Sequence, residues 1–342
     1  MSNCYFSVER AGIYTTFQDS GYDFLQHFGV TTGGVVDNNL FRTANKLLGN
    51  DDNEPVIEFA YQGPKLKLEK GNVQIAITGD VHFIISKKSE NYTDTLGKCF
   101  QTYQLHEGDI IDIIATKSSI YGYFGLLGGF KLNKYNSSGS TLVRSKIGPN
   151  DGRKIQENQL IEFNKESQNE KLKQISFPTT DKSNVIRVIE GPQESFFSLE
   201  TINQFYNSPF TISKSADRMG IRLDGNQIIS KQSPNIPSEG IIKGSVQVPG
   251  DGNPIVLMVD HPTIGGYPKI ATVILNDLVK LAQLSFGKEV SFEKVSIETA
   301  ENLYYENKNN LDEIFKSIKN YNNKYLLYTL VECQIITRLY FM

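Results

Sequence analysis

The amino-acid sequence predicts a mainly β protein with a few inserted helices, arranged as barrels or sandwiches. Short apolar or alternating runs recur along the chain, separated by Gly, Asn, Asp and Pro, as is typical of strands joined by turns. A helical pattern does not follow each run, which argues against a doubly wound α/β fold. The runs that predict strands are 73–78, 110–115, 120–127, 185–190 and 255–259.

The length of the chain predicts two domains. At 342 residues it exceeds the usual size of one core, and its hydrophobic content of 39% is enough to bury a sizeable interior. The polar segment 164–184 is the best candidate for a linker. We therefore expect an N-terminal β subdomain over 1–175, a C-terminal one over 185–305, and a helical or apolar tail over 306–342.

Three helices are expected. Asp37 is placed to cap a helix that ends before Gly49, with an apolar stripe between them. Apolar residues at helical spacing predict a second helix over 272–284, and a third is expected over 297–305. A separate amphipathic helix is expected within 306–324.

Charge and cysteine content limit the classes of partner and location. The net charge is −3, from 35 basic and 38 acidic residues, and the basic residues form no stripe, which argues against binding nucleic acid. The densest basic cluster, Lys65, Lys67 and Lys70, alternates with leucines and predicts the solvent face of a strand. Three scattered cysteines, no signal-peptide pattern and no apolar run of membrane length favour a cytoplasmic protein that does not bind a membrane.

Several common catalytic signatures are missing from the sequence. It contains no phosphate-binding P-loop, no dinucleotide fingerprint and no Gly-x-Ser-x-Gly elbow. Its four histidines lie far apart, so no metal site is predicted. It also lacks a Met-Lys-Met tripeptide, the usual attachment site of biotin. Three glycine-rich polar segments remain as candidates for the functional site.

The first segment, 16–50, places Gly33 and Gly34 shortly before the expected helix. A helix N-terminus after such glycines can bind an anion, although a tight turn capped by Asp37 explains the same residues.

The second segment, 213–225, contains Ser215, Asp217, Arg218 and Arg222. Two arginines so close together can clamp a carboxylate, because the guanidinium group matches it with two parallel hydrogen bonds. A surface turn followed by an outward-facing arginine on a strand is the alternative.

The third segment, 238–269, has glycines and prolines on both sides of an apolar strand. These would bring two loops together, so that a set of polar side chains converges on one rim. The alternative is a pair of simple hairpin turns. The converging residues are Gln247, Asp260, Thr263, Tyr267 and Lys269.

Taken together, motifs in these segments resemble one family over residues 7–300. In chain order they are Gln18-Asp19-x-Gly21, Gly29-Val30-x-x-x-Gly34-x-x-Asp37, Ala44-Asn45-x-Leu47-x-Gly49-Asn50, Glu58 with Gly63-Pro64, Gly191-Pro192-Gln193, Ser215-x-Asp217-Arg218-Met219-Gly220-x-Arg222-Leu223, Gln247-Val248-Pro249-Gly250 and Thr263-x-Gly265-Gly266-Tyr267-Pro268. The family is that of the 5-oxoprolinase C subunit, also called the KipA or allophanate hydrolase subunit 2 family, which is biotin-dependent carboxyltransferase-like. The chain departs from its pattern at Tyr22, Thr31, Gly33 to Val36 and Asn253.

The resemblance implies a fold and a function. The fold is a pair of cyclophilin-like β-barrel subdomains. The function is that of one component of an enzyme, active only in complex, that opens 5-oxoproline to glutamate with ATP. The implied partners are a KipI-like B subunit and a further A subunit. Since the chain has no nucleotide loop, ATP would be bound with or on a partner.

Within that reading we assign roles to the polar residues. The expected catalytic residues are Lys269, Tyr267, Asp260 and Gln247. The expected substrate-binding residues are Arg218, Arg222, Asp217, Ser215, Thr263, Gly265 and Gly266. Arg218 and Arg222 would hold the substrate carboxylate, Asp217 would orient them, and Lys269 with Tyr267 would stabilise developing charge.

Two alternatives stay open. The chain could be the carboxyltransferase component of a biotin-dependent urea or amide carboxylase, with biotin carried on another chain. It could also be a KipA-like regulatory protein that binds a KipI-like inhibitor without turning over a substrate.

Overall fold

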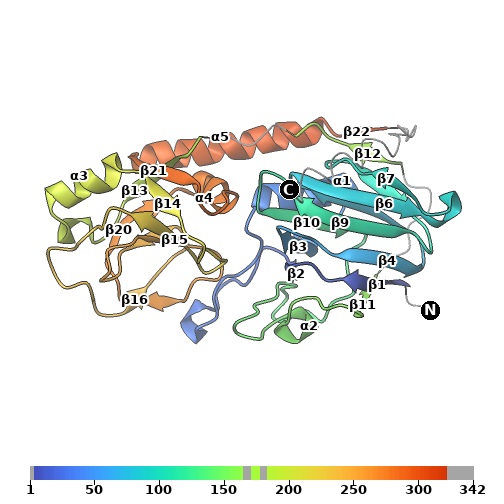
Figure 1. Cartoon of the computed structure of the whole chain (residues 1–342), viewed down its shortest axis with the longest axis horizontal. Helices are drawn as coiled ribbons and strands as arrows, with labels where there is room; N and C mark the ends of the chain where they lie inside the picture. The colour runs from blue at the N-terminus through green and yellow to red at the C-terminus, as the bar shows by residue number, and fades with distance from the viewer. Residues whose placement is uncertain (1–3, 165–170, 178–182, 322–342) are drawn as a thin grey trace.

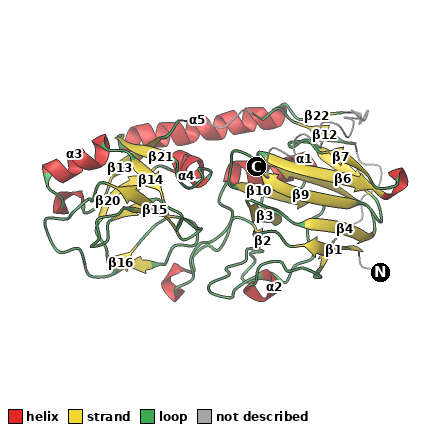
Figure 2. Ribbon diagram, in the orientation of Figure 1, coloured by secondary structure: helices red, strands yellow, loops and turns green. Residues whose placement is uncertain are grey.

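The computed structural model describes residues 4–164, 171–177 and 183–321. The chain forms two β-rich halves that lie side by side, with one long helix running along the edge of both (Figure 1). Strands dominate both halves, and the helices lie mostly at their margins (Figure 2). The predicted class, mainly β with inserted helices, is therefore confirmed.

The N-terminal half contains two β-sheets. Its strands are β1 (Cys4–Arg10), β2 (Tyr14–Gln18), β3 (Val56–Ala60), β4 (Lys65–Lys70), β5 (Val73–Thr78), β6 (Val81–Lys87), β7 (Thr93–Leu96), β8 (Thr102–Leu105), β9 (Ile110–Thr116), β10 (Tyr121–Leu126) and β11 (Leu160–Phe163). One sheet has the order β11-β1-β4-β9-β6-β7 and the other β2-β3-β10-β5-β8. Buried aromatic and aliphatic side chains, including Phe6, Phe83 and Phe124, form one cluster that draws on both sheets. In β4 the leucines are buried and the lysines are not, as the alternation predicts.

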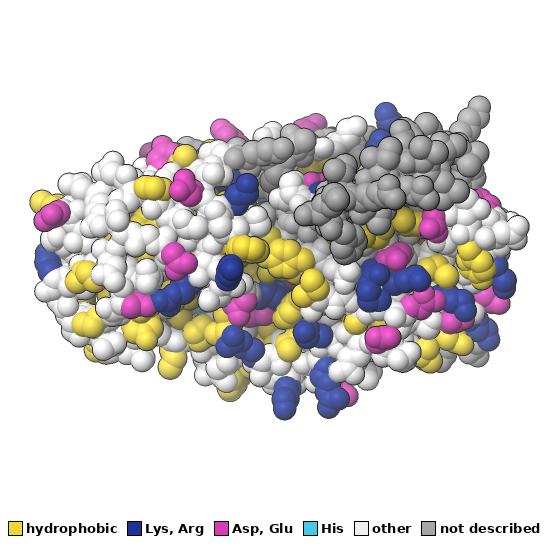
Figure 3. All heavy atoms as spheres, in the orientation of Figure 1, with side chains coloured by type: hydrophobic (Ala, Val, Ile, Leu, Met, Phe, Trp, Pro, Cys, Tyr) yellow, Lys and Arg dark blue, Asp and Glu magenta, His cyan; other side chains and the backbone are white. Residues whose placement is uncertain are grey.

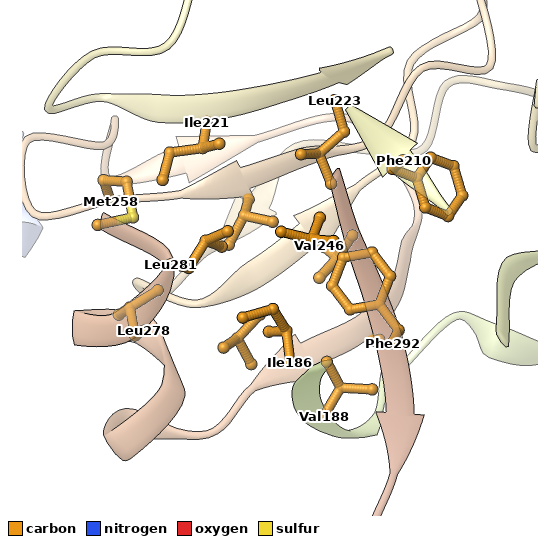
Figure 4. Close-up of a cluster of buried hydrophobic side chains, with 14 of the residues drawn as sticks. Ile186, Val188, Phe210, Ile221, Leu223, Val246, Met258, Leu278, Leu281 and Phe292 are labelled. Carbon is orange, nitrogen blue, oxygen red and sulfur yellow. The ribbon is translucent and has the colours of Figure 1, made fainter. Parts of the chain in front are cut away.

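The C-terminal half is a closed seven-stranded barrel. Its strands are β13 (Val185–Glu190), β14 (Phe210–Ile212), β15 (Gly220–Gly225), β17 (Ser245–Gln247), β18 (Ile255–Leu257), β20 (Lys269–Val273) and β21 (Glu289–Lys294). They close in the order β13-β20-β17-β18-β15-β14-β21. Side chains from several strands meet helix residues Leu278 and Leu281 inside the barrel (Figure 4). The interior is therefore a packed core and not a channel.

Two short ribbons complete the sheets. In one, β16 (Glu239–Gly240) pairs with β19 (Ile264–Gly265) beside the barrel. In the other, β12 (Lys173–Gln174) pairs with β22 (Lys319–Asn320), which brings the end of the described chain back to the N-terminal half.

The helices partly match the expected ones. They are η1 (Gln26–Phe28), α1 (Asn38–Leu48), η2 (Lys88–Glu90), α2 (Pro149–Gly152), η3 (Glu194–Phe196), α3 (Leu199–Asn207), α4 (Leu275–Ala282) and α5 (Ile297–Lys316). Asp37 caps α1 through its side chain and Gly49 ends it in the left-handed conformation, both as predicted. The expected start of the second helix at residue 272 is wrong, because β20 continues to Val273 and pairs there with β13.

Helix α5 joins the two halves of the molecule. It is continuous over residues that predict two separate helices, so the expected boundary at residue 306 falls inside it. One end contacts α4 and the other contacts α1. Ile314 and Phe315 pack against a buried cluster that includes Leu47 and Leu48, and Arg42 lies 5.4 Å from the Phe315 ring. The apolar stretch 326–342 lies outside the described residues.

Within the described part of the chain, none of the helices combines the length and apolar character that crossing a bilayer requires.

Candidate functional site

A buried arginine joins the two halves. Arg218, in the turn between β14 and β15, is 5% exposed. Its Nε and Nη2 donate to the two carboxylate oxygens of Asp260, each at 2.9 Å. Nη2 also donates to the carbonyl oxygen of Gly34 at 2.7 Å, and Nη1 donates to Glu58. Since Gly34 and Glu58 belong to the N-terminal half, one guanidinium group connects that half to the barrel.

The N-terminal partners of this arginine are themselves held in place. Glu58 is fully buried on β3, and its Oε2 accepts from the Val36 backbone N–H and from the Tyr123 hydroxyl, both at 2.8 Å. A second link runs through Gln283, which follows α4. Its amide donates to Asp37 at 3.0 Å, and its Oε1 accepts from the Tyr121 backbone N–H at 2.9 Å. The interface is therefore a hydrogen-bonded polar network with fixed geometry.

Electrostatics keep Arg218 charged. Burial alone would lower the pKa of its guanidinium, but Asp260 and Glu58 outweigh burial and raise that pKa well above its ordinary value. Removing Arg218 would leave the fully buried Glu58 carboxylate without its cation, which is among the costliest changes a protein core can undergo.

The structure gives Arg218 and Asp217 different tasks from those expected. Four hydrogen bonds to protein oxygens leave the guanidinium one N–H, so it is not free to clamp a substrate carboxylate with two parallel bonds. The expectation that Asp217 orients the arginines is wrong. Asp217 accepts from the backbone N–H of Met219 at 2.8 Å within its own turn and pairs with exposed Arg144 at 3.2 Å. Asp260 and Glu58 orient Arg218 instead.

The other expected residues of the second segment lie outside this network. Arg222, on β15, forms an ion pair with Asp251, and both side chains are partly exposed. Ser215 is exposed. The segment therefore supplies one interface residue and no carboxylate clamp.

A second buried cluster lies where β17 meets β20. Gln247 and Lys269 are paired across these strands, and they are 5% and 3% exposed. The amide nitrogen of Gln247 has no hydrogen-bond acceptor among the described residues, and the Nζ of Lys269 meets only one oxygen there, Oε1 of Glu239. Buried donors are almost always satisfied in folded proteins, so an amide with no acceptor beside an ammonium group with only one calls for a ligand or a functional explanation.

The β16/β19 ribbon covers this cluster. Glu239, opposite Gly265 in the ribbon, places its Oε1 2.5 Å from Lys269 Nζ as an ion pair. Gln193 supports both partners: its amide donates to Glu239 at 2.8 Å, and its Oε1 accepts from the Lys269 backbone N–H at 3.1 Å. Lys269, followed by Gln193, lowers the pKa of the Glu239 carboxyl. The Glu239 side chain is nevertheless 45% exposed, so it reaches the lysine from the solvent side.

Residue 265 must be a glycine, because there is no space for a side chain at this position. A Cβ there would lie 2.5 Å from the Gln247 amide nitrogen and 3.1 Å from Ile241. The backbone of the ribbon thus rests directly on the unsatisfied amide. On the same loop, Tyr267 is 39% exposed and Thr263 is half-buried, with its backbone carbonyl bonded to the Ile241 N–H.

The polar residues that were expected on a single rim are therefore divided between two separate clusters. Gln247 and Lys269 come together as predicted, whereas Asp260 belongs to the Arg218 network. Sequence reasoning did not assign site roles to Glu58, Glu239 and Gln193. A signal for Glu58 was present, because a carboxylate inside a fully buried five-residue strand requires a partner.

A pocket of about 190 Å³ lies between the two halves, against Arg218. Its walls are mostly apolar and include Tyr14, Tyr121, Ile221 and Leu284. Figure 3 shows hydrophobic side chains around a hollow in the middle of one face. Burial raises the pKa of Tyr14 to about 12, so its hydroxyl stays protonated at neutral pH. Across residues 4–164, 171–177 and 183–321, no group of three His, Cys, Asp or Glu side chains is arranged to hold a metal ion.

These features define a class of protein: a two-sheet half and a closed barrel joined by a buried arginine–carboxylate network. The same arrangement of the backbone occurs in the urea amidolyase of K. lactis, which superimposes with a TM-score of 0.82 at 24% identity over 95% of this chain and 21% of that one. The likeness concerns the fold, and the chain spans about a fifth of that enzyme.

Residues 28–294 match the family described as carboxyltransferase domain, subdomain A and B, and the chain belongs to this family. Among curated relatives, it is 33% identical to the 5-oxoprolinase C subunit of Haemophilus influenzae over 90% of the chain and 96% of the relative. It is 30% identical to the 5-oxoprolinase C subunit of Escherichia coli over 86% and 92%. It is also 26% identical to the urea amidolyase of Lachancea kluyveri, over 88% of the chain and 17% of that protein.

Proposed function

We propose that this chain is the C subunit of a 5-oxoprolinase complex, which opens 5-oxoproline to glutamate with ATP. The observation that carries the proposal is the pair of buried nitrogens on Lys269 and Gln247, one with a single acceptor and one with none in the described chain, in a chain that matches one component of 5-oxoprolinase over nearly its whole length. Lysine and amide donors of this kind recognise oxygen atoms of a polar substrate. The name of the relatives indicates that the substrate is 5-oxoproline, which is a lactam, or cyclic amide.

The chain supplies only part of the reaction. Because its sequence has no phosphate-binding loop, ATP is bound on a partner or across the interface with one. The partners in this proposal are a KipI-like B subunit and an A subunit. A cytoplasmic location belongs to the same proposal, since the three cysteines form no motif of an oxidising compartment.

The residues divide into two groups under this proposal. Lys269 and Gln247 face the substrate, with Tyr267, Thr263, Gly265 and Gly266 on the loop around them. Arg218 and Asp260 fix the barrel against the N-terminal half and act on the substrate only through that geometry. Arg222 and Ser215 have no assigned contact with the substrate.

The test is to co-express the chain with candidate A and B subunits and to measure ATP hydrolysis and glutamate formation with and without 5-oxoproline. We expect 5-oxoproline to stimulate ATP hydrolysis. Lys269→Met should lower kcat/KM by at least about tenfold, the value of a hydrogen bond to a charged group. The matched control is Lys294→Met, since Lys294 also pairs with carboxylates on the barrel but is 43% exposed. A complex without 5-oxoproline-dependent turnover would refute the proposal.

A second candidate is supported by the urea amidolyase relatives: a carboxyltransferase component for urea or another amide, with biotin on another chain. A biotinylated partner recovered with the chain, together with urea-dependent activity, would favour it. Formation of a stable complex with no activity on a lactam or on urea would favour the regulatory, KipA-like alternative.

A further inference from the structure

We infer that Lys269 and Gln247 together bind the carboxylate of the substrate, and that the Glu239 carboxylate occupies this place until the substrate arrives. This rests on the proposed function for the identity of the substrate, 5-oxoproline. That the site binds a carboxylate is inferred from the contacts of Lys269, Gln247 and Glu239 alone.

The first argument is the position of the two donors. Gln247 and Lys269 are register partners on antiparallel neighbours, next to a β-bulge, and both side chains are buried. The same ribbon covers both: Gly265 lies over the Gln247 amide, and Glu239, its partner in the ribbon, reaches Lys269. A cation and a neutral N–H donor under one cover can serve the two oxygens of a single carboxylate.

The second argument concerns the group that already contacts the Nζ of Lys269. Glu239 meets Lys269 through one oxygen at 2.5 Å, and the Gln247 amide is left without an acceptor among the described residues. A carboxylate therefore fits at Lys269, but Glu239 satisfies only half of the donor pair. A substrate carboxylate that reached both nitrogens would be bound better than the protein's own side chain.

The third argument is how easily Glu239 can be displaced. Its side chain is 45% exposed, and the ribbon that carries it is two residues long on each strand. Ion pairs with an exposed partner contribute little to stability, so replacing this one by a ligand costs little. Lys269, by contrast, is fixed on a barrel strand and stays in place.

The arginines do not compete for this role. Arg218 has given four hydrogen bonds to Asp260, Glu58 and Gly34, and Arg222 pairs with Asp251 on the surface. Lys269 is thus the cation whose only ion-pair partner comes from a short exposed ribbon, within the part of the barrel that the structure describes.

The experiment compares 5-oxoproline with 2-pyrrolidinone, the same lactam ring without a carboxylate, as substrates of the assembled complex. Lys269→Met should lower kcat/KM for 5-oxoproline by about 10–100-fold and leave 2-pyrrolidinone nearly unchanged. Gln247→Leu should act in the same direction, by about tenfold or less. If both substrates lose activity equally, Lys269 serves the lactam ring and the inference is wrong.

Glu239→Gln gives an independent test, since it keeps the shape of the side chain and removes its charge. We expect KM for 5-oxoproline to fall by up to about fivefold with kcat unchanged, because the competing anion is gone. A side chain that only supports the ribbon would give an unchanged or higher KM, and that result would overturn the displacement.

Calorimetric titration of the isolated full chain separates this inference from the proposed function. Wild type should bind 5-oxoproline more tightly than 2-pyrrolidinone, and Lys269→Met should remove the difference, whether or not the complex turns over a lactam. Binding that depends on Lys269 without turnover would refute only the function. Turnover with no preference for the carboxylate would refute only the inference.

Discussion

The two buried clusters of charged and polar residues differ in how completely they are satisfied. Around Arg218, the guanidinium group finds two carboxylates and a backbone carbonyl in the protein interior. Around Lys269, the Gln247 amide nitrogen lacks a hydrogen-bond acceptor in the described chain, and the single oxygen that meets the ammonium group comes from an exposed ribbon. The first arrangement joins the two halves of the molecule, whereas the second is the site that we propose for the substrate carboxylate.

This difference offers a way to distinguish buried charged residues that support the fold from those that bind a ligand. The third glycine-rich segment contributes to both clusters, Asp260 to one and Gln247 with Lys269 to the other, so residue type alone does not distinguish them. A satisfied buried ion pair contributes to stability mainly in the sense that breaking it is costly. An unsatisfied buried donor weakens the fold, so its presence points to a ligand.

The largest expected effect comes from breaking the satisfied cluster. Arg218→Met leaves Glu58 buried without its cation and removes the bridge to Gly34, so the free energy of unfolding should fall by about 3–5 kcal/mol. Urea denaturation of the full chain measures this loss. The control is Arg222→Met, an arginine in an exposed pair, which should change stability by less than about 1 kcal/mol. Equal losses for the two variants would mean that the Arg218 network is not what secures the interface.

The next largest loss of stability should come from removing the neutral link across the interface, Gln283. Gln283→Leu removes the acceptor of the Ile120 and Tyr121 backbone N–H groups and the donor to Asp37. Leaving buried N–H groups unsatisfied should cost about 2–3 kcal/mol. Hydrogen exchange should show faster exchange at those two amides. If neither stability nor exchange changes, water replaces the glutamine and the link is dispensable.

The unsatisfied cluster should respond in the opposite way. Lys269→Met removes a buried ammonium group whose one ion-pair partner in the described chain is the exposed Glu239, and methionine keeps most of the side-chain volume. The free energy of unfolding should therefore stay within about 1 kcal/mol of wild type or rise, while kcat/KM of the complex for 5-oxoproline falls by about 10–100-fold. A large loss of stability instead would assign Lys269 to the structure and erase the contrast with Arg218.

The smallest effect is a pH dependence at Glu239. Its pKa is lowered from the ordinary 4.5 by Lys269, so the ion pair stabilises the folded state above about pH 4.5 and is lost as pH falls through the folded pKa. Glu239→Gln has no such contribution. The stability advantage of wild type over Glu239→Gln should be under about 1 kcal/mol at neutral pH and shrink on acidification. Acid and urea titrations of both proteins would contradict this if the advantage grew at low pH.

Local features of the fold were predictable because local chemistry determines them. The cap at Asp37, the stop at Gly49 and the alternation in β4 each follow from a few neighbouring residues. The start of α4 was mistaken because the β-branched residues 272–274 fit a strand as well as a helix, and pairing of β20 with β13 decides between them. The join of two expected helices into α5 was missed because the polar junction 306–310 interrupts the apolar pattern, although it contains no Gly or Pro that would end a helix.

The site was predictable only in part. The pairing of Gln247 with Lys269 was expected because two loops flank one strand. The partners of Arg218 were not, since Glu58 and Gly34 lie in the other half, and a single sequence carries no information about which distant residues meet. Glu239 was in the right segment, but its role depends on the register of a two-residue ribbon.

The path of α5 determines how the two halves of the chain stay associated. Because its last turns pack on Leu47 and Leu48 and β22 pairs with β12, the end of the described chain is fastened to the half that was made first. The covalent link between the halves is thus not the only tie between them. A molecule nicked once between β12 and β13 should still migrate as a single particle, whereas the first half made alone would present an uncovered apolar surface to its surroundings.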